Sequence, residues 1–303
     1  MENTTRTASR GAAFLLLALA TLFWAGNWVL GRALRETFEP NALNLWRWLI
    51  AAVVLAPFAL PRLRAGLPAI RRSAGLLVLL SFLGVALFQS LVYTGLKTTT
   101  AVNAVLLNSS FPAFMLLCSF AIERERATRM QVGGMLISLA GILVILARGE
   151  PENLARLEFH SGDALILLAM PVWGVYSVLL RRRPPELDGI VFLFVISVIG
   201  VALLLPVFAI EAIRSPPRWP GGEGVAAALY VGLAASVGAF ICWNRGVAIV
   251  GANAAGFMIH LLPAFGSLLA IVFLGESFRP FHAVGIATIL AGVLVATRPA
   301  ARR

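Results

Sequence analysis

Ten stretches of about twenty apolar residues divide this chain, and they constrain its fold more than any other feature. The hydrocarbon core of a bilayer is about 30 Å thick, and a helix of roughly 20 apolar residues crosses it. The stretches lie at residues 11–31, 41–60, 73–94, 99–120, 130–147, 163–180, 189–213, 223–243, 252–274 and 280–297. The polar segments between them are too short to form a soluble domain. We therefore predict an all-α polytopic membrane protein with ten transmembrane helices.

Composition and charge placement support this prediction. Only 13% of the residues are charged, whereas soluble domains have about 25%. The net charge of +11 would favour nucleic acid on a soluble surface, but here most of the arginines fall in alternate segments between the stretches. Because Lys and Arg are retained on the cytoplasmic side, we predict that both termini are cytoplasmic. The expected partners are the lipid bilayer and a small-molecule substrate, with no nucleic acid, and the oligomeric state stays open, a monomer included.

The chain contains an internal duplication. At a separation of 151 residues, identical residues recur in matching context: Pro112 and Pro263, Glu125 and Glu276, Gly134 and Gly285, Gly141 and Gly292. We predict one five-helix unit at residues 1–147 and a second at 163–303, joined by a periplasmic loop at 148–162. Since five crossings are an odd number, the second unit enters the membrane from the opposite side. Inverted repeats of this kind are typical of transporters with a substrate site near the midplane.

Several short motifs resemble one family. They are Trp24-Ala25-Gly26-Asn27, Pro40 followed by Arg47, Pro112 followed by Glu125, and Pro263 with Leu274-Gly275-Glu276. Together with the helix number and the duplication, they resemble the drug/metabolite transporter superfamily over nearly the whole chain, and within it the ten-helix group with two EamA-type repeats. The second copy of the first motif departs from the pattern and reads Trp173-Gly174-Val175-Tyr176. The resemblance implies an exporter of small metabolites, notably amino acids including aromatic ones, in the inner membrane of a bacterium.

Acidic residues are excluded from the interior of the predicted spans. All 14 Asp and Glu residues lie between the stretches or at their ends. This pattern argues against metal ligands, a cofactor site or paired catalytic carboxylates in the membrane, and so against a lipid-modifying enzyme. It also favours facilitated movement by alternating access over obligatory proton exchange. A proton-coupled exporter of drugs, purines or other metabolites remains the alternative.

The few polar and aromatic residues inside the spans are the candidates for substrate contact. Aromatic rings can stack on a flat apolar side chain, and amides can both donate and accept hydrogen bonds, as a zwitterion requires. Interhelical hydrogen bonding is the alternative for each amide. The candidates are Trp24, Asn27, Trp28, Gln89, Tyr93, Asn108, Ser109, Trp173, Tyr176 and His260.

Arg47 and His260 are the ionisable side chains, other than Tyr and Cys, that lie well inside a span. Arg47 could hold a substrate carboxylate or pair with helix-end carbonyls. We favour the structural role, because the resemblance implies that this Arg is shared across unlike substrates. His260 could line the cavity or be a packed histidine, and both remain open. Its counterpart in the first unit is Ser109, and we expect the two to face each other across the pseudo-twofold axis.

Pro112 and Pro263 are predicted gating or kink positions. A proline within a helix frees the carbonyl four residues earlier, here those of Asn108 and Ile259. Such carbonyls either line a cavity or mark a simple kink.

The remaining duplicated residues are expected to be structural. Gly134 and Gly141, like Gly285 and Gly292, lie seven residues apart on one helical face. They predict close packing between the fifth and tenth helices, away from the pathway. Glu125 and Glu276 are expected to anchor helix ends.

Overall fold

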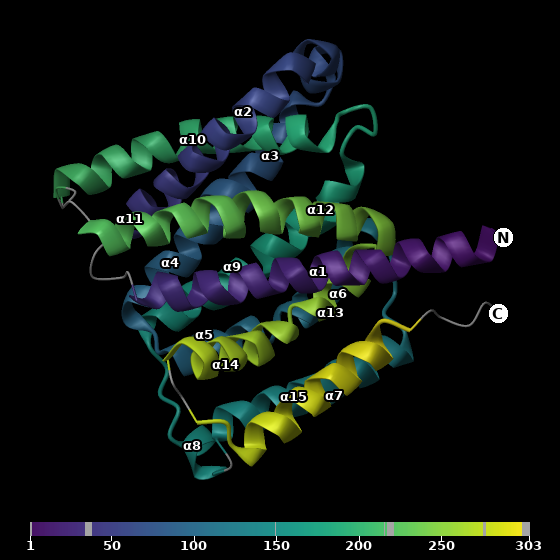
Figure 1. The fold of residues 1–303 in the computed structure, drawn as a ribbon, viewed down its shortest axis with the longest axis vertical. Coiled ribbons are helices and arrows are strands. Elements are labelled where there is room, and N and C mark those ends of the chain that lie inside the picture. The colour runs from purple at the N-terminus through teal and green to yellow at the C-terminus, as the bar shows by residue number, and fades with distance from the viewer. Residues whose placement is uncertain are drawn as a thin grey trace.

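The computed structural model describes residues 2–33, 38–148, 150–214, 216, 221–274 and 277–298. All regular elements in these ranges are helices (Figure 1). In chain order they are α1 (Glu2–Ala33), α2 (Pro40–Arg72), α3 (Ala74–Ser81), η1 (Phe82–Leu87), α4 (Phe88–Thr98), α5 (Ala101–Asn108), α6 (Phe111–Glu123), α7 (Arg129–Ala147), α8 (Glu152–Ala155), α9 (Ser161–Leu179), η2 (Leu180–Arg182), α10 (Gly189–Arg214), α11 (Gly221–Tyr230), η3 (Val231–Gly238), α12 (Ala239–Val250), α13 (Ala252–Met258), α14 (Leu261–Leu274) and α15 (Pro280–Ala296).

Nine helical stretches of the described residues are long and apolar enough to cross a membrane. They coincide with the first nine apolar stretches of the sequence. The tenth stretch forms α15, which has 17 residues and so lies at the short end of the length that spans a bilayer. The count of ten crossings therefore stays a prediction.

Helix α2 is longer than the apolar pattern predicted. The expected span ends at residue 60, but the helix continues to Arg72 and passes Pro61 and Pro68 on the way. Arginine is a good helix former and its charged end can face water. The last turns of α2 therefore continue where the apolar pattern has ended.

The third and fourth spans of each unit carry the same two irregularities. The third is interrupted by a π-helical segment, η1 in the first unit and η3 in the second. The fourth is broken into two half-helices, α5 and α6 in the first unit and α13 and α14 in the second, with the turns centred near Ser109 and His260. Irregular backbone at membrane depth is found where it is buried in protein or lines a cavity.

The two units are interleaved. The most extensive helix pairs, α7 with α15, α2 with α10, α1 with α12, and α4 with α9, each join one unit to the other. Figure 1 shows α2 and α10 together at the top of the bundle, α7 and α15 together at the bottom, and α1, α9 and α12 between them. The core is thus built from both units.

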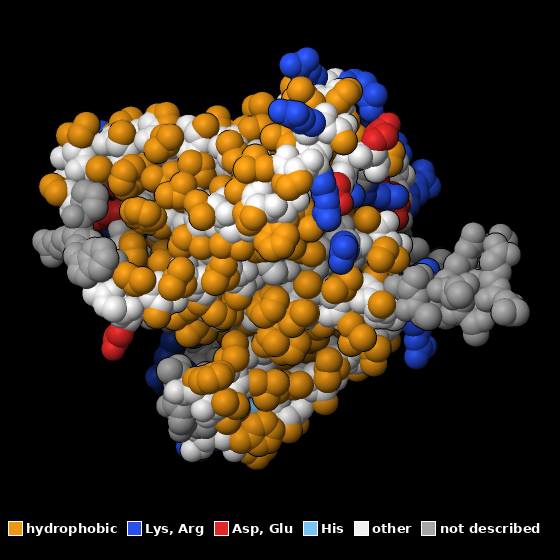
Figure 2. Space-filling model, turned by 45° about the horizontal axis from the view of Figure 1, so that its top comes forward, with side chains coloured by type: hydrophobic (Ala, Val, Ile, Leu, Met, Phe, Trp, Pro, Cys, Tyr) orange, Lys and Arg blue, Asp and Glu red, His pale blue; other side chains and the backbone are white. Residues whose placement is uncertain are grey.

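The ends of the bundle differ in character. Helix α1 begins and α15 ends at one end, whereas α8 lies at the other (Figure 1). Figure 2 shows Lys and Arg side chains gathered near the end where α1 begins, beside a broad apolar surface. Large apolar side chains are exposed on the outside of the bundle, among them Leu15, Val272 and Phe273, which suits contact with lipid tails. The arginine distribution predicts that the end bearing α1's start is cytoplasmic.

Candidate functional site

A cavity lies in the middle of the bundle, where the two units meet. Its free volume is about 30 Å³, which holds water-sized molecules. The apolar part of its lining is Trp24, Trp28, Phe88, Phe111, Trp173, Phe240, Ile259 and Leu262, and the polar part is Asn27, Arg47, Gln89 and Asn108. Both units therefore supply walls to one central site.

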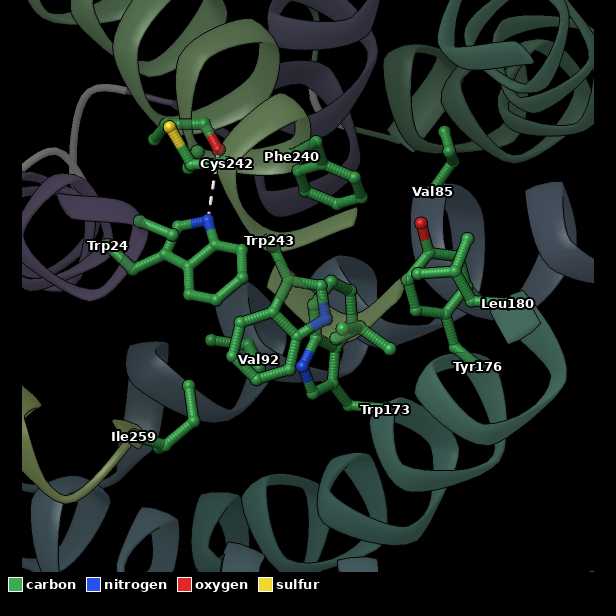
Figure 3. Packing of buried hydrophobic residues seen from close by; sticks show 14 of the residues in the cluster. Trp24, Val85, Val92, Trp173, Tyr176, Leu180, Phe240, Cys242, Trp243 and Ile259 are labelled. Carbon is green, nitrogen blue, oxygen red and sulfur yellow. Dashed lines mark hydrogen bonds between the residues drawn. The ribbon is translucent and has the colours of Figure 1, made fainter. Parts of the chain in front are cut away.

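A cluster of aromatic rings forms one wall of this cavity. Figure 3 shows Trp24, Trp173, Phe240 and Trp243 converging from α1, α9 and α12. The ring centroids of Trp24 and Trp173 are 5.3 Å apart in an edge-to-face arrangement. Tyr176 stacks on Trp173 at 4.7 Å, and Trp243 lies 5.1 Å from Trp24. Offset and edge-to-face geometries of this kind stabilise aromatic pairs, so Trp173 is held rigidly by its neighbours.

Two amide side chains in the wall are available to a substrate. Gln89 is 4% exposed and Asn108 is 5% exposed, and neither side chain bonds to any other residue in the described part of the chain. Each offers two N–H donors and a carbonyl acceptor. Buried amides are normally paired, so these two side chains keep unused hydrogen-bonding capacity in the cavity wall.

Arg47 is fully buried in α2 and is held by neutral groups. Its Nε atom donates to Ser236 Oγ at 2.8 Å, and Nη1 donates to Tyr93 Oη at 3.0 Å. The Tyr93 hydroxyl in turn donates to Asn27 Oδ1 at 2.7 Å. A guanidinium has five N–H donors, and three of them are used, the third on the carbonyl of Ala235 at 3.2 Å. Among the described residues, no carboxylate pairs with Arg47.

The π-helical segments explain how Arg47 and Trp24 find backbone acceptors. In a π-helix each backbone carbonyl accepts from the N–H of the residue five positions later, and such segments recur at functional sites. In η3 the carbonyl of Ala235 accepts from Arg47 and also from Trp24 Nε1 at 3.0 Å (Figure 3). In η1 the carbonyls of Val85 and Ala86 accept from Asn44 Nδ2 at 3.1 and 3.2 Å. Helix α2 is thus fastened to both π-segments, one from each unit.

The residues that line the cavity follow the internal sequence repeat. Three pairs of lining residues are separated by 151 positions: Gln89 and Phe240, Asn108 and Ile259, Phe111 and Leu262. Trp24 and Trp173 form a fourth pair, 149 positions apart. Each pair contributes one residue from each unit. The cavity therefore follows the internal pseudosymmetry in position, although the second unit supplies mainly apolar side chains.

The two broken spans meet at Ser109 and His260. The Nε2 atom of His260 lies 2.9 Å from the carbonyl oxygen of Ser109, and Nδ1 contacts the Ser138 hydroxyl of α7. The Ser109 hydroxyl bonds carbonyls of its own helix, at Val105 and Leu106. His260 is 0% exposed, so its ring joins helices instead of facing the cavity.

The two prolines lie in the first turn of the second half-helices. Pro112 is the second residue of α6, and Pro263 is the third of α14. The first turn leaves its N–H groups without intrahelical partners, so proline is tolerated there. The expectation of a freed carbonyl at Ile259 is wrong, because that oxygen accepts from the Leu262 N–H at 2.9 Å.

The structure gathers part of the predicted set of substrate-contacting residues around the cavity. Six of the ten line it, namely Trp24, Asn27, Trp28, Gln89, Asn108 and Trp173. Four do not: Tyr93, Ser109, Tyr176 and His260. Tyr93 and Tyr176 contact lining residues from behind, and Tyr176 donates to Asn244 Oδ1 at 3.2 Å.

Sequence reasoning missed several wall residues. Arg47, expected to be structural, lines the cavity as well as joining helices. Phe240 and Ile259 were not proposed, although they are the repeat counterparts of Gln89 and Asn108. Applying the repeat separation to each candidate would have found them.

The four duplicated glycines lie between α7 and α15. A Cβ atom added at Gly134 would lie 2.5 Å from the carbonyl oxygen of Gly292, and one at Gly141 would lie 2.7 Å from that of Gly285. Backbones can approach this closely only without side chains.

Of the two duplicated glutamates, Glu125 lies within the described residues and Glu276 does not. Glu125 follows α6, accepts from Ser119 Oγ at 3.2 Å and lies 3.5 Å from Arg181 Nη1. Glu276 lies outside the described residues. Within the described ranges, no three His, Cys, Asp or Glu side chains come together as metal ligands would.

Comparison with known proteins gives a consistent result. The model of the EamA-like transporter family matches residues 11–147 and again residues 160–298. An uncharacterized transporter of Archaeoglobus fulgidus is 28% identical over 284 residues, which cover 93% of this chain and 96% of that protein. A solved structure described only as "crystal structure of protein" matches with a TM-score of 0.74 at 24% identity, over 94% of this chain and 96% of the other.

Two relatives have names that mention a substrate. A probable terminal-alkyne amino-acid exporter of Streptantibioticus cattleyicolor is 26% identical over 288 residues, covering 93% of this chain and 92% of that protein. An S-adenosylmethionine/S-adenosylhomocysteine transporter of Chlamydia trachomatis is 27% identical over 279 residues, covering 88% and 84%.

Proposed function

Because the chain belongs to the EamA-like transporter family, we propose that it exports small neutral metabolites, above all amino acids including aromatic ones. The observation that carries this proposal is the central cavity, which both units line and which combines an aromatic wall with unpartnered amides. Its setting is the inner membrane of a bacterium, with the two units of residues 1–147 and 163–303 joined by a periplasmic loop.

The chemistry of the lining suits an amino acid. The side chain of an aromatic substrate would pack against Trp24 and Trp173. The amides of Gln89 and Asn108 can donate to a carboxylate and accept from an ammonium group. The guanidinium of Arg47, which also lines the cavity, adds positive charge and has two N–H groups left to donate.

The names of two relatives support the same substrate class. One is a probable exporter of an amino acid, and the other is a transporter of S-adenosylmethionine and S-adenosylhomocysteine. These molecules share an α-amino and a carboxylate group. Recognition of that shared group by the amides and by Arg47 would tolerate different side chains.

The mechanism we infer is alternating access. The broken spans α5–α6 and α13–α14 both line the cavity, and discontinuous helices of this kind form the substrate sites of many transporters that work by alternating access. We infer facilitated movement down the substrate gradient, since no carboxylate of the described residues lines the cavity and the His260 ring is engaged by Ser109 and Ser138.

Flux in liposomes tests the proposal. Purified protein should accelerate efflux of labelled phenylalanine, tryptophan, threonine or methionine over protein-free liposomes. A Gln89→Leu, Asn108→Leu double variant of normal stability should lose most of this flux. Absence of stimulated flux for all four amino acids would contradict the substrate class.

A separate measurement tests the energy source. An imposed pH gradient alone should not drive accumulation of an amino acid. Accumulation against a gradient that disappears in a His260→Ala variant would favour proton-coupled export instead.

A further inference from the structure

Each unit contains a hairpin of helices with irregular backbone at both of its ends. The first hairpin, residues 82–108, runs from η1 through α4 and α5 to the break near Ser109, and its turn is at residues 99–100. The second hairpin, residues 231–258, runs from η3 through α12 and α13 to the break near His260, and its turn is at Gly251. Regular helical hydrogen bonding is interrupted at these ends, so they are the places where each hairpin can bend.

Both hairpins pack in the same way against a helix of the other unit. A Cβ atom added at Gly95 of α4 would lie 2.9 Å from Ile166 of α9, and one added at Gly246 of α12 would meet the Leu17 side chain of α1. Gly95 and Gly246 are 151 positions apart, and Leu17 and Ile166 are 149 positions apart, like Trp24 and Trp173. Both hairpins are thus closed onto the bundle, in agreement with the small free volume of the central cavity.

A buried carboxylate fastens the first hairpin. Asp163 is the third residue of α9 and is 1% exposed. Its carboxylate accepts from Asn103 Nδ2 of α5 at 2.7 Å and from the Thr99 hydroxyl of the turn. It also accepts from the His160 backbone N–H at 2.7 Å. The turn of the first hairpin is therefore held to the start of α9 by hydrogen bonds to a charged group, which are stronger than those between neutral groups.

The second hairpin lacks this fastening. Asn253 lies 150 positions after Asn103, and among the described residues neither Nδ2 nor Oδ1 of Asn253 has a hydrogen-bond partner. On α1, the residues that lie 151, 150 and 149 positions before Asp163 are Ala12, Ala13 and Phe14. None of these side chains can accept a hydrogen bond. The two hairpins therefore share their packing and differ in the buried carboxylate.

The carboxylate lies between the central cavity and one end of the bundle. Asn108 at the end of α5 and Trp173 of α9 line the cavity. Asn103 and Asp163 stand near the starts of the same two helices, at the end of the bundle where α8 lies (Figure 1). The arginine distribution predicts that this end is periplasmic. A movement of the first hairpin away from α9 that exposes the cavity on that side has to break the hydrogen bonds of Asp163.

We propose that Asp163 is a latch that keeps the periplasmic side of the transporter closed. With the latch in place, the first hairpin opens less readily than the second. The cavity is then reached mainly from the cytoplasmic side, where an exporter loads its substrate. The latch rests on the proposed function, because it controls the step in which the substrate leaves.

The accessibility of a single thiol tests the latch without any amino acid present. In a Cys118→Ala, Cys242→Ala background, Gln89→Cys places the thiol in the cavity wall, and a membrane-impermeant maleimide is applied to one face at a time. Asp163→Ala should raise the rate of labelling from the periplasmic face by about tenfold, the loss of a hydrogen bond to a charged group. The rate rises because it follows the fraction of molecules that are open on that side. Labelling from the cytoplasmic face should not rise.

The comparison of the two faces separates a latch from a purely structural residue. An unchanged rate from the periplasmic face would overturn the proposal. A rise from both faces would show that Asp163 only stabilises the fold, and would overturn it as well. Glu152→Gln, an exposed carboxylate of α8 at the same end of the bundle, is the control and should leave both rates unchanged.

Asn103→Ala tests the latch from the side of the hairpin and stays informative if Asp163→Ala fails to fold. It removes the donor to Asp163 and to the Glu158 carbonyl, and it should also raise labelling from the periplasmic face alone. Because both variants break the same fastening, the double variant should label little faster than Asp163→Ala, whereas the effects of independent sites would multiply. Multiplied effects, or no rise in Asn103→Ala, would overturn the proposal.

Amino-acid flux separates the latch from the proposed function. Faster periplasmic labelling of Asp163→Ala, in protein that moves none of the four amino acids, supports the latch and contradicts only the substrate class. Flux together with unchanged labelling of Asp163→Ala contradicts only the latch.

Discussion

The Nε2 atom of His260 lies 2.9 Å from the carbonyl oxygen of Ser109, and the two residues are 151 positions apart, the separation that relates the two units. A carbonyl only accepts, so Nε2 carries a proton and donates it. In the neutral ring, Nδ1 then accepts from the Ser138 hydroxyl. One histidine thus joins both broken spans to α7.

Replacing His260 should therefore weaken the junction. We expect His260→Leu to lower the free energy of unfolding by about 1–3 kcal/mol, because the buried Ser109 carbonyl loses its donor. Thermal unfolding in detergent measures this loss. Ser267→Ala is the control, since that hydroxyl bonds only the Pro263 carbonyl of its own helix. Equal stability of the two variants would contradict the junction.

The glycine contact between α7 and α15 gives a prediction with an adjacent control. Gly134→Ala places a Cβ 2.5 Å from the Gly292 carbonyl oxygen and should cost about 1–3 kcal/mol through overpacking. The neighbouring Gly133 has nothing within 4 Å of an added Cβ. Gly133→Ala should be neutral or stabilise by about 0.5–1 kcal/mol, since alanine is the better helix former. Thermal unfolding of the two variants should differ clearly, and equal unfolding temperatures would contradict the close approach.

Arg47 should not be replaceable by lysine. An ammonium group cannot reach Ser236, Tyr93 and the Ala235 carbonyl together, as the planar guanidinium does. We expect Arg47→Lys to lower stability by about 1–3 kcal/mol and to reduce amino-acid flux by tenfold or more. Arg64→Lys, on the exposed part of α2, should change neither. Normal flux in Arg47→Lys would show that the guanidinium geometry is dispensable.

Variants of Gln89 and Asn44 should affect different properties, the first the binding of substrate and the second the stability of the protein. Gln89→Leu removes an amide that has no partner in the described part of the chain, so stability should hold while the KM for amino acids rises by about tenfold, the loss of one hydrogen bond to a charged group. Asn44→Leu removes three bonds, to Val85, Ala86 and Ser90, and should instead lower the unfolding temperature. Flux assays and thermal unfolding on the same preparations compare the two. A loss of stability in Gln89→Leu would argue that its amide is structural.

The family and the helical class could be read from the sequence because both depend on pattern. Apolar stretches of membrane length predicted the spans, and the resemblance carried by Trp24, Arg47, Pro112 and Pro263 is confirmed by the family match over both halves. The duplication also located the two irregular fourth spans, since their prolines recur at one separation.

The remaining features depend on contacts that hydropathy does not record. A π-segment changes hydrogen bonding without changing the apolar character of residues 82–87, so η1 and η3 left no signal. Asp163 read as an ordinary acid at a span end, yet it is 1% exposed because Thr99, Asn103 and His160 satisfy it. His260 gave no sequence signal that could separate lining from packing, because only the three-dimensional position of Ser138 decides its role.

The interleaving of the two units bears on what a conformational change can be. A movement of one unit involves the other, because α2, α4 and α7 are each packed against a helix of the other unit. If the two units are inverted relative to each other, as the odd number of crossings predicts, a change of the backbone angle at the Ser109 turn has an inverted counterpart at the His260 turn. If the two turns exchange their backbone angles, each unit takes the conformation that the other had, and the molecule opens toward the opposite side of the membrane. The two forms then differ in free energy through the side chains that break the pseudosymmetry, such as Arg47 and Asn253, and a solute shifts the balance by the difference between its affinities for the two forms.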